Sequence, residues 1–194
     1  MEELDEMMMS LGNQFNKMHV DNTTKYINHK YLTKLDTDIE LIKSELSSNV
    51  TPLYIMCKYG LTEIMKWYII NKNLNEIYEY NDTPLHIAVK YNQINTVELL
   101  CANNITINIS NLYNLYPIDY AIKTNNIEMI KLLLLSGADI NLSFHNAIYY
   151  SNNSILAELL KYNIKYITLE NALHIAYKNN NTFAIDLLIH HIET

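Results

Sequence analysis

The sequence predicts an all-α solenoid, in which one structural unit is repeated and stacked along the chain. The string Thr83-Pro84-Leu85-His86-Ile87-Ala88 has one copy 32 residues earlier, at 51–56, and another 33 residues later, at 116–121. Self-similarity at such a period is the signature of a repeat architecture. With 49% hydrophobic residues in a chain of 194, the stacked units can bury a continuous core. Pairs of leucines recur as well, at Leu99-Leu100, Leu132-Leu133, Leu159-Leu160 and Leu187-Leu188.

Start signals for helices accompany the repeated string. Thr51 offers a side-chain oxygen as an N-cap, and Pro52 falls in the first turn, where a missing amide donor costs nothing. Thr62 is expected to cap the second helix of this unit. In the next unit we expect helices over 84–91 and 94–103. The side chains expected to be buried are Ile64, Trp67, Tyr68, Leu85, Ala88, Leu99, Leu100, Leu132 and Leu133.

The amino-acid sequence of the repeated unit resembles that of the ankyrin repeat. The third copy closes with Gly137-Ala138-Asp139-Ile140-Asn141, in which Gly137 can take the left-handed conformation that ends a helix. Copies of the string at a constant spacing, together with this Gly-Ala-Asp-Ile-Asn ending, are specific to that family. The resemblance covers roughly 49–192 and, loosely, 23–48. It implies an ankyrin-repeat solenoid of about five helix-pair repeats, with short β-finger turns, an N-terminal helical cap and a surface suited to binding.

We expect two parts in the chain. Residues 1–48 form an N-terminal extension and a helical cap, and residues 49–194 form the ankyrin repeats. The cap is expected to hold two short helices, 24–32 and 36–46, the second with Ile39, Ile42 and Leu46 on one face. The repeats are expected at about 49–80, 81–110, 111–142, 143–169 and 170–194.

The last two repeats are shorter than the others. The leucine pairs are separated by 33, 27 and then 28 residues, so the missing residues fall in the connections between helix pairs. Repeats four and five should therefore keep their helices and lose most of the finger. His174 aligns with His86, and the resemblance implies that an imidazole at this position ties neighbouring repeats together through hydrogen bonds to backbone.

Composition argues against several classes of function. The net charge is −7, and all 14 basic residues are lysines, which disfavours nucleic acid as a partner. Three glycines leave no phosphate-binding loop, and no nucleophile and base lie at a recognisable spacing, so we expect no enzyme, no cofactor and no small-molecule substrate. The seven histidines and two cysteines complete no metal set, and Cys57 and Cys101 should be free thiols. With no secretory signal and no apolar run long enough for a membrane span, we expect a cytoplasmic protein.

A row of lysines and tyrosines is the candidate binding surface. The resemblance implies that the last two positions of each first helix face the concave side, where Lys58-Tyr59, Lys90-Tyr91 and Lys123-Thr124 would stack. Tyrosines are frequent binding hot spots, and a row of lysines favours an acidic patch on the partner. The fingers add Glu79, Tyr80, Asp82, Leu112, Tyr113 and Leu115. The alternative is ordinary solvated surface, with Leu112 and Leu115 packed on each other. The candidate protein-binding residues are Lys58, Tyr59, Tyr80, Lys90, Tyr91, Tyr113, Leu115 and Lys123.

The irregular repeats, rich in Ile, Asn and Tyr, are also similar to poxvirus ankyrin proteins, especially at 126–134. That resemblance implies a host-range or immune-evasion protein in a short form without a C-terminal F-box-like segment. The expected function is then binding and inhibition of a host cytosolic signalling or restriction factor, with a host protein as the partner. The alternative is a cellular or bacterial-effector ankyrin adaptor that scaffolds a different complex.

Overall fold

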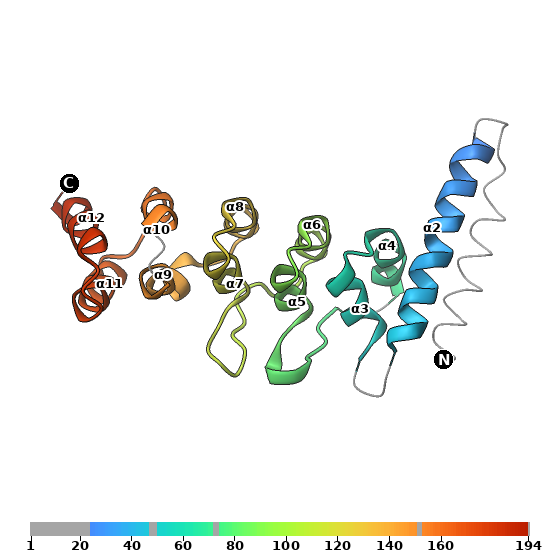
Figure 1. Ribbon diagram of the computed structural model, residues 1–194, viewed down its shortest axis with the longest axis horizontal. Helices are drawn as coiled ribbons and strands as arrows, with labels where there is room; N and C mark the ends of the chain where they lie inside the picture. The colour runs from blue at the N-terminus through green and yellow to red at the C-terminus, as the bar shows by residue number, and fades with distance from the viewer. Residues whose placement is uncertain (1–23, 47–49, 72–73, 151–152, 194) are drawn as a thin grey trace.

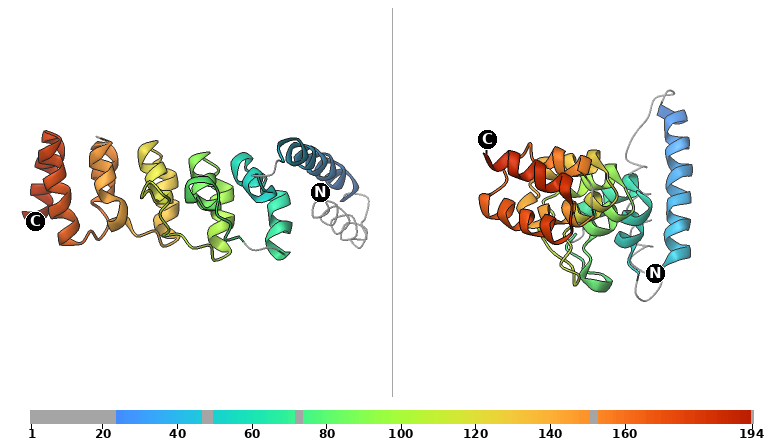
Figure 2. Two further views of the ribbon diagram at one scale, coloured as in Figure 1. Left: turned by 90° about the horizontal axis from the view of Figure 1, so that it is seen from below. Right: turned by 60° about the vertical axis from the view of Figure 1, so that its left-hand side comes forward.

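Helix pairs stacked in a row form the molecule. The computed structural model describes residues 24–46, 50–71, 74–150 and 153–193. The pairs stand side by side, beginning next to α2 and ending at the C-terminal helices (Figure 1). The first helices of the pairs form one layer and the second helices the other, which confirms the expected all-α ankyrin-type solenoid (Figures 1 and 2). The helices are α2 (Thr24–Glu45), α3 (Pro52–Tyr59), α4 (Thr62–Asn71), α5 (Pro84–Lys90), α6 (Ile94–Ala102), α7 (Pro117–Lys123), α8 (Ile127–Leu135), α9 (Ile140–Tyr149), α10 (Asn153–Leu159), α11 (Tyr166–Lys178) and α12 (Thr182–Glu193).

Most of the predicted helix signals act as expected, but Thr62 is the first residue inside α4 and not the residue that precedes it, so its predicted role as an N-cap is wrong. The Thr51 hydroxyl accepts a hydrogen bond from the Tyr54 amide at 3.2 Å, and Pro52 follows in the first turn of α3. Gly137 has φ +103°, a conformation that a residue with a side chain rarely adopts, and it follows the end of α8. Asp139 then caps α9, because its carboxylate accepts from the Asn141 amide. The fourth pair consequently begins at Ile140, before the predicted start of repeat four.

The N-terminal cap differs from the prediction. Residues 24–45 form one continuous helix, α2, and not two short ones. No glycine or proline interrupts this segment, and the Thr37 hydroxyl, at the start of the expected second helix, donates to the Lys34 carbonyl at 2.7 Å within the continuous helix. Ile39 and Ile42 are buried as expected, whereas Leu46, just beyond the helix end, is 38% exposed.

The core lies between the two helix layers and between adjacent pairs. Leu85, Ala88, Leu100 and Leu133 are fully buried, as predicted. The predicted burial of Leu99 and Leu132 is wrong, because both are only half-buried. Adjacent residues lie about 100° apart around a helix, so only the second leucine of each of these pairs points into the core.

Other predictions for the core have mixed outcomes. Ile64 and Tyr68 are buried, and the side chain of Trp67 lies outside the described part of the structure. Cys57 is buried, Cys101 is half-buried, and both are free thiols.

The connections divide the solenoid into two kinds of repeat. The segments before α5 and α7, described over 74–83 and 103–116, project below the first-helix layer (Figure 1). The segments before α9 and α11, at 136–139 and 160–165, are short, which confirms the predicted loss of fingers. Residues 74–83 and 103–116 contain no β-strand; a single turn of 3₁₀ helix, Glu79–Asn81, is the one regular element of 74–83, and Val50, just before α3, is an isolated β-bridge residue.

His174 does not serve the role that alignment with His86 implied. It lies in the middle of α11 and is exposed. This helix begins at Tyr166, and it directs Leu169, Ala172 and Ala176 into the core. His174 lies outside that buried set, so the alignment of its string with the one around His86 does not carry over to its environment.

Candidate protein-binding surface

Two fingers with fixed backbone project from the first-helix layer. We call residues 74–83 the first finger and residues 103–116 the second finger. The first is closed by a hydrogen bond from the Tyr78 amide to the Asp82 carbonyl at 2.8 Å, and the second by one from Asn111 to Leu115 at 2.9 Å. The Asn111 side chain also accepts from the Tyr113 and Leu115 amides. These bonds hold both turns in a defined shape.

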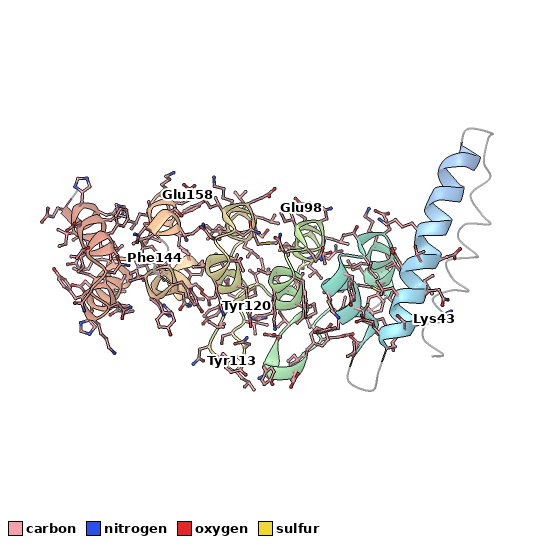
Figure 3. All side chains as sticks on the ribbon, in the orientation of Figure 1. Lys43, Glu98, Tyr113, Tyr120, Phe144 and Glu158 are labelled. Carbon is pink, nitrogen blue, oxygen red and sulfur yellow. The ribbon has the colours of Figure 1, made fainter. Side chains whose placement is uncertain are left out.

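The two fingers also contact each other. The Leu112 amide donates to the Tyr80 carbonyl at 2.8 Å, and the rings of Tyr80 and Tyr113 lie 5.3 Å apart between centroids. Tyr80 is 48% exposed, Tyr113 61% and Leu112 65%. We call these three residues the finger-tip patch; Tyr113 is seen at its place, away from the helix layers, in Figure 3. Rigid backbone therefore presents large apolar side chains to solvent.

His86 anchors the second finger to α5. Its Nδ1 accepts from the Thr83 amide at 3.1 Å, so Nε2 carries the proton and donates to the Leu115 carbonyl at 3.0 Å. Burial lowers the pKa of this imidazole, which favours its neutral form. The predicted tie between repeats is confirmed for His86. Leu115 is half-buried and contributes its carbonyl to this tie.

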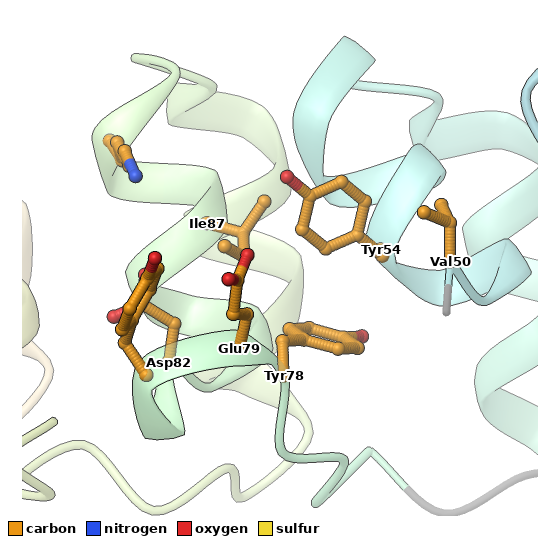
Figure 4. A pocket seen from close by; sticks show the side chains of 8 residues that line it. Val50, Tyr54, Tyr78, Glu79, Asp82 and Ile87 are labelled. Carbon is orange, nitrogen blue, oxygen red and sulfur yellow. The ribbon is translucent and has the colours of Figure 1, made fainter. Parts of the chain in front are cut away.

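A pocket lies between the first finger and the helices α3 and α5 (Figure 4). We call it the finger pocket; its volume is about 500 Å³, and it is lined by Val50, Tyr54, Tyr78, Glu79, Tyr80, Asp82, Ile87 and Lys90. The rings of Tyr54 and Tyr78 meet edge to face, 5.1 Å apart. The Tyr78 hydroxyl donates to Glu76 at 2.9 Å, and burial raises the pKa of this phenol. The sequence prediction missed Tyr54 and Tyr78. The signal available was the tyrosine at 54, in the place that His86 takes one repeat later.

The predicted lysine row is not a continuous positive surface. Lys58 forms an ion pair with Glu45 at 2.8 Å and lies 4.5 Å from the centre of the Tyr59 ring. The Tyr59 hydroxyl donates to the same carboxylate, and both bonds lower the pKa of Glu45. The helical cap therefore already engages the first Lys-Tyr pair.

The other two lysines of the row lie over rings of the next repeat. The Lys90 ammonium is 5.9 Å from the centre of the Tyr120 ring, and the Lys123 ammonium is 5.8 Å from that of Tyr150. Tyr91 ends α5, is 40% exposed and shares a hydrogen bond with Tyr54. The structure thus brings Tyr80 and Lys90 to the wall of the finger pocket, and Tyr91 next to the lining residue Tyr54.

Comparison with known families agrees with this architecture. The ankyrin-repeat profile, described as "Ankyrin repeats (3 copies)", matches residues 24–111 and 53–143. No curated protein matches the chain. Within the described ranges, no helix is long and apolar enough to span a bilayer, and no three His, Cys, Asp or Glu side chains cluster as metal ligands. Because the match covers more than half of the sequence and the fold agrees with it, the chain belongs to the ankyrin-repeat family of protein–protein interaction modules.

Proposed function

We propose that the chain acts by binding a protein partner across repeats one to three, on the side of α3, α5 and α7 that carries the fingers, and that it catalyses no reaction. The observation that supports this is the finger-tip patch. Its three large side chains are exposed although hydrogen bonds fix the backbone beneath them. Exposed apolar side chains on a fixed frame lose little conformational entropy on binding, and tyrosine is enriched in binding hot spots.

The proposed contact residues surround this patch. Lys90 and Tyr91 extend it toward the finger pocket, and Lys123 extends it along the row of first helices. Lys58 and Tyr59 lie at its edge, where Glu45 holds them. Leu115 contributes by fixing the second finger. In the full proposal the contact residues are Lys58, Tyr59, Tyr80, Lys90, Tyr91, Tyr113, Leu115 and Lys123.

The finer proposal is that the chain is a viral ankyrin protein of the host cytoplasm, which binds and inhibits a host signalling or restriction factor. Its support is the similarity of the lettering at 126–134, and of the Ile-, Asn- and Tyr-rich repeats, to poxvirus ankyrin proteins. A binding surface without a catalytic centre suits a protein that acts by sequestering another.

The test is affinity capture with the full chain, followed by identification of the captured proteins, in poxvirus-infected and uninfected cells. We expect a host signalling or restriction factor to be captured, and the variant Tyr80→Ala/Tyr113→Ala to lose it. The matched control is Tyr166→Ala/Tyr177→Ala, which removes two equally exposed tyrosines from α11 and should keep the partner.

Two outcomes would change the proposal. Undiminished capture by folded Tyr80→Ala/Tyr113→Ala would place the binding site away from the fingers. Capture of an unrelated multiprotein complex, equal in both kinds of cell, would favour a cellular or bacterial-effector adaptor. A matching thermal melt of both variants is required, since each should leave the buried core untouched.

A further inference from the structure

The finger pocket contains carboxylates without a cation from the chain itself. Asp82 is only 4% exposed, and its carboxylate accepts from the Asn111 amide group at 2.8 Å. The Glu79 side chain points into the space between Ile87 and the Tyr54 ring (Figure 4). Among the described residues, neither carboxylate forms an ion pair. Lys90 lines the same pocket, yet its ammonium lies toward the Tyr120 ring and pairs with neither of them.

All charged residues of the first finger are acidic. Residues 74–82 contain Glu76, Glu79 and Asp82 and no basic residue. Glu76 is occupied within the chain, because it accepts from Thr51 and from Tyr78. Glu79 is exposed and faces the pocket; it interacts with the Tyr80 phenol, whose pKa it raises, but no cation among the described residues neutralises its charge. An anionic ligand would be repelled here, and a cationic one would be attracted.

The walls of the pocket suit the rest of a long cationic side chain. Val50 and Ile87 provide aliphatic surface for a methylene stem, and the rings of Tyr54, Tyr78 and Tyr80 provide aromatic surface beside the charged end. A cation close to an aromatic ring is attracted by the negative electrostatic potential of the ring face. The pocket volume of about 500 Å³ lies in the range typical of ligand sites and accommodates one lysine or arginine side chain with neighbouring backbone.

We propose that the finger pocket receives a lysine or arginine side chain from an extended segment of the protein partner, with an apolar neighbour of that residue on the finger-tip patch; this rests on the proposed function. The cation lies against the Glu79 carboxylate, and the apolar side chain packs on Tyr80 and Tyr113. The row of lysines would have favoured an acidic partner segment. The pocket favours the opposite charge, because Glu45 neutralises Lys58, and the two carboxylates beside Lys90, Glu79 and Asp82, form no ion pair among the described residues.

The test begins with a phage-displayed library of random dodecapeptides selected on the full chain at neutral pH and physiological salt. We expect the selected sequences to share a lysine or arginine within a few positions of an aromatic or aliphatic residue. The best peptide, labelled with fluorescein, is then titrated by anisotropy against the wild type and single variants.

Three variants make the titration specific. Glu79→Gln should weaken binding about 5- to 10-fold through loss of the charge-assisted contact. The control Glu98→Gln removes the same charge from the second-helix layer, away from the fingers, and should change affinity less than about 2-fold (Figure 3). Lys90→Gln should strengthen binding about 2- to 3-fold, because it removes a like charge from the pocket rim.

The outcomes separate this inference from the proposed function. It is overturned by an acidic or uncharged consensus, by a library that yields no binder, or by equal effects of Glu79→Gln and Glu98→Gln. The inference is also overturned if Lys90→Gln lowers the affinity for the peptide, because that result would indicate an acidic ligand. If native partner capture requires Tyr80 and Tyr113 but is unchanged in Glu79→Gln, the proposed function stands and the cation assignment is wrong. Full displacement of the peptide by equimolar spermine would assign the pocket to a free polyamine.

Discussion

The finger-bearing half of the solenoid, α3–α8, and the fingerless half, α9–α12, stack the same helix pair but join neighbouring pairs with different chemistry. In the first half, His86 donates to a finger carbonyl, that of Leu115. At the border of the second half, Asp119 takes the equivalent position in α7 and accepts from the Asn146 side chain on α9 at 2.7 Å. The connection before α9 is too short to offer a finger carbonyl there.

The two ties share one feature and differ in another. His86 accepts the Thr83 amide and Asp119 accepts the Tyr116 amide, so each closes the first turn of its own helix. A neutral imidazole has a second nitrogen that donates, whereas a carboxylate only accepts. At these two positions the residue type matches what the next unit presents, which is a finger carbonyl for His86 and a helix side-chain amide for Asp119.

The variant Phe144→Ala in α9 should have the largest effect on stability and tests whether the two halves unfold separately. Phe144 is fully buried, and its truncation should lower the free energy of unfolding by about 3–5 kcal/mol. Stability in a solenoid is a sum over repeats and their interfaces, so the loss should fall mainly on the fingerless half. Urea unfolding followed by circular dichroism should shift more than the fluorescence of Trp67, the single tryptophan, which belongs to α4. Equal shifts of both signals would show that the halves unfold as one.

The second test compares two adjacent leucines of α6 in the finger-bearing half. Leu100→Ala should cost about 2–5 kcal/mol, because Leu100 is fully buried. Leu99→Ala should cost about 1 kcal/mol, since this side chain is half-buried. Thermal and urea melts of the two variants measure the difference. Identical destabilisation would contradict the orientation of α6 described above.

A smaller effect is expected for His86→Gln, with a defined pH dependence. Loss of the tie should cost about 1–3 kcal/mol at pH 7. Burial lowers the pKa of His86 below its usual value of 6.5, so the unfolded chain binds a proton more readily than the folded one. The stability from His86 is present above pH 6.5 and is lost as pH falls below it. Melts between pH 7 and 5 should show this loss in the wild type and a weaker one in the variant; parallel curves would refute it.

The smallest effect is expected for Asp119→Asn. The contribution of Asp119 to stability should depend on pH in the direction opposite to that of His86. The variant should lose about 1 kcal/mol at pH 7, because Asp119 accepts from the Tyr116 amide and the Asn146 side chain with two oxygens, whereas an asparagine side chain has only one acceptor oxygen. Burial raises the pKa of Asp119 above 3.8, so the folded chain holds this proton more tightly. Its contribution is present at and below pH 3.8 and declines as pH rises through the folded pKa. The difference in unfolding free energy between variant and wild type should therefore change as pH rises above 3.8, and a constant difference would argue against the raised pKa.

Much of the fold could be predicted from the sequence because its signals are local. The cap at Thr51, the left-handed Gly137 and the shortened spacing of the leucine pairs each depend on a few neighbouring residues. The sequence wrongly predicted two helices in the N-terminal cap where the structure has one. Residues such as Thr37 and Asp38 are compatible with both a helix start and a helix interior.

The candidate site was predicted only in part, because its geometry depends on distant segments. Tyr80 and Tyr113 were found from the finger positions, and their contact depends on a hydrogen bond between two fingers. The partners of the lysine row, Glu45 for Lys58 and Tyr120 for Lys90, come from other structural units and gave no signal in the repeat itself.

The sequence by itself determined the repeat, its helices, the loss of fingers after the third unit and the presence of tyrosines and lysines at recurrent positions. Only the tertiary structure decided which of these side chains are free to bind. Charge and exposure are properties of neighbours in space, and stacking places Glu45 against Lys58 while leaving Glu79 without a cation among the described residues. A periodic sequence fixes what recurs in every unit, and the contacts between units determine where one unit differs from the next.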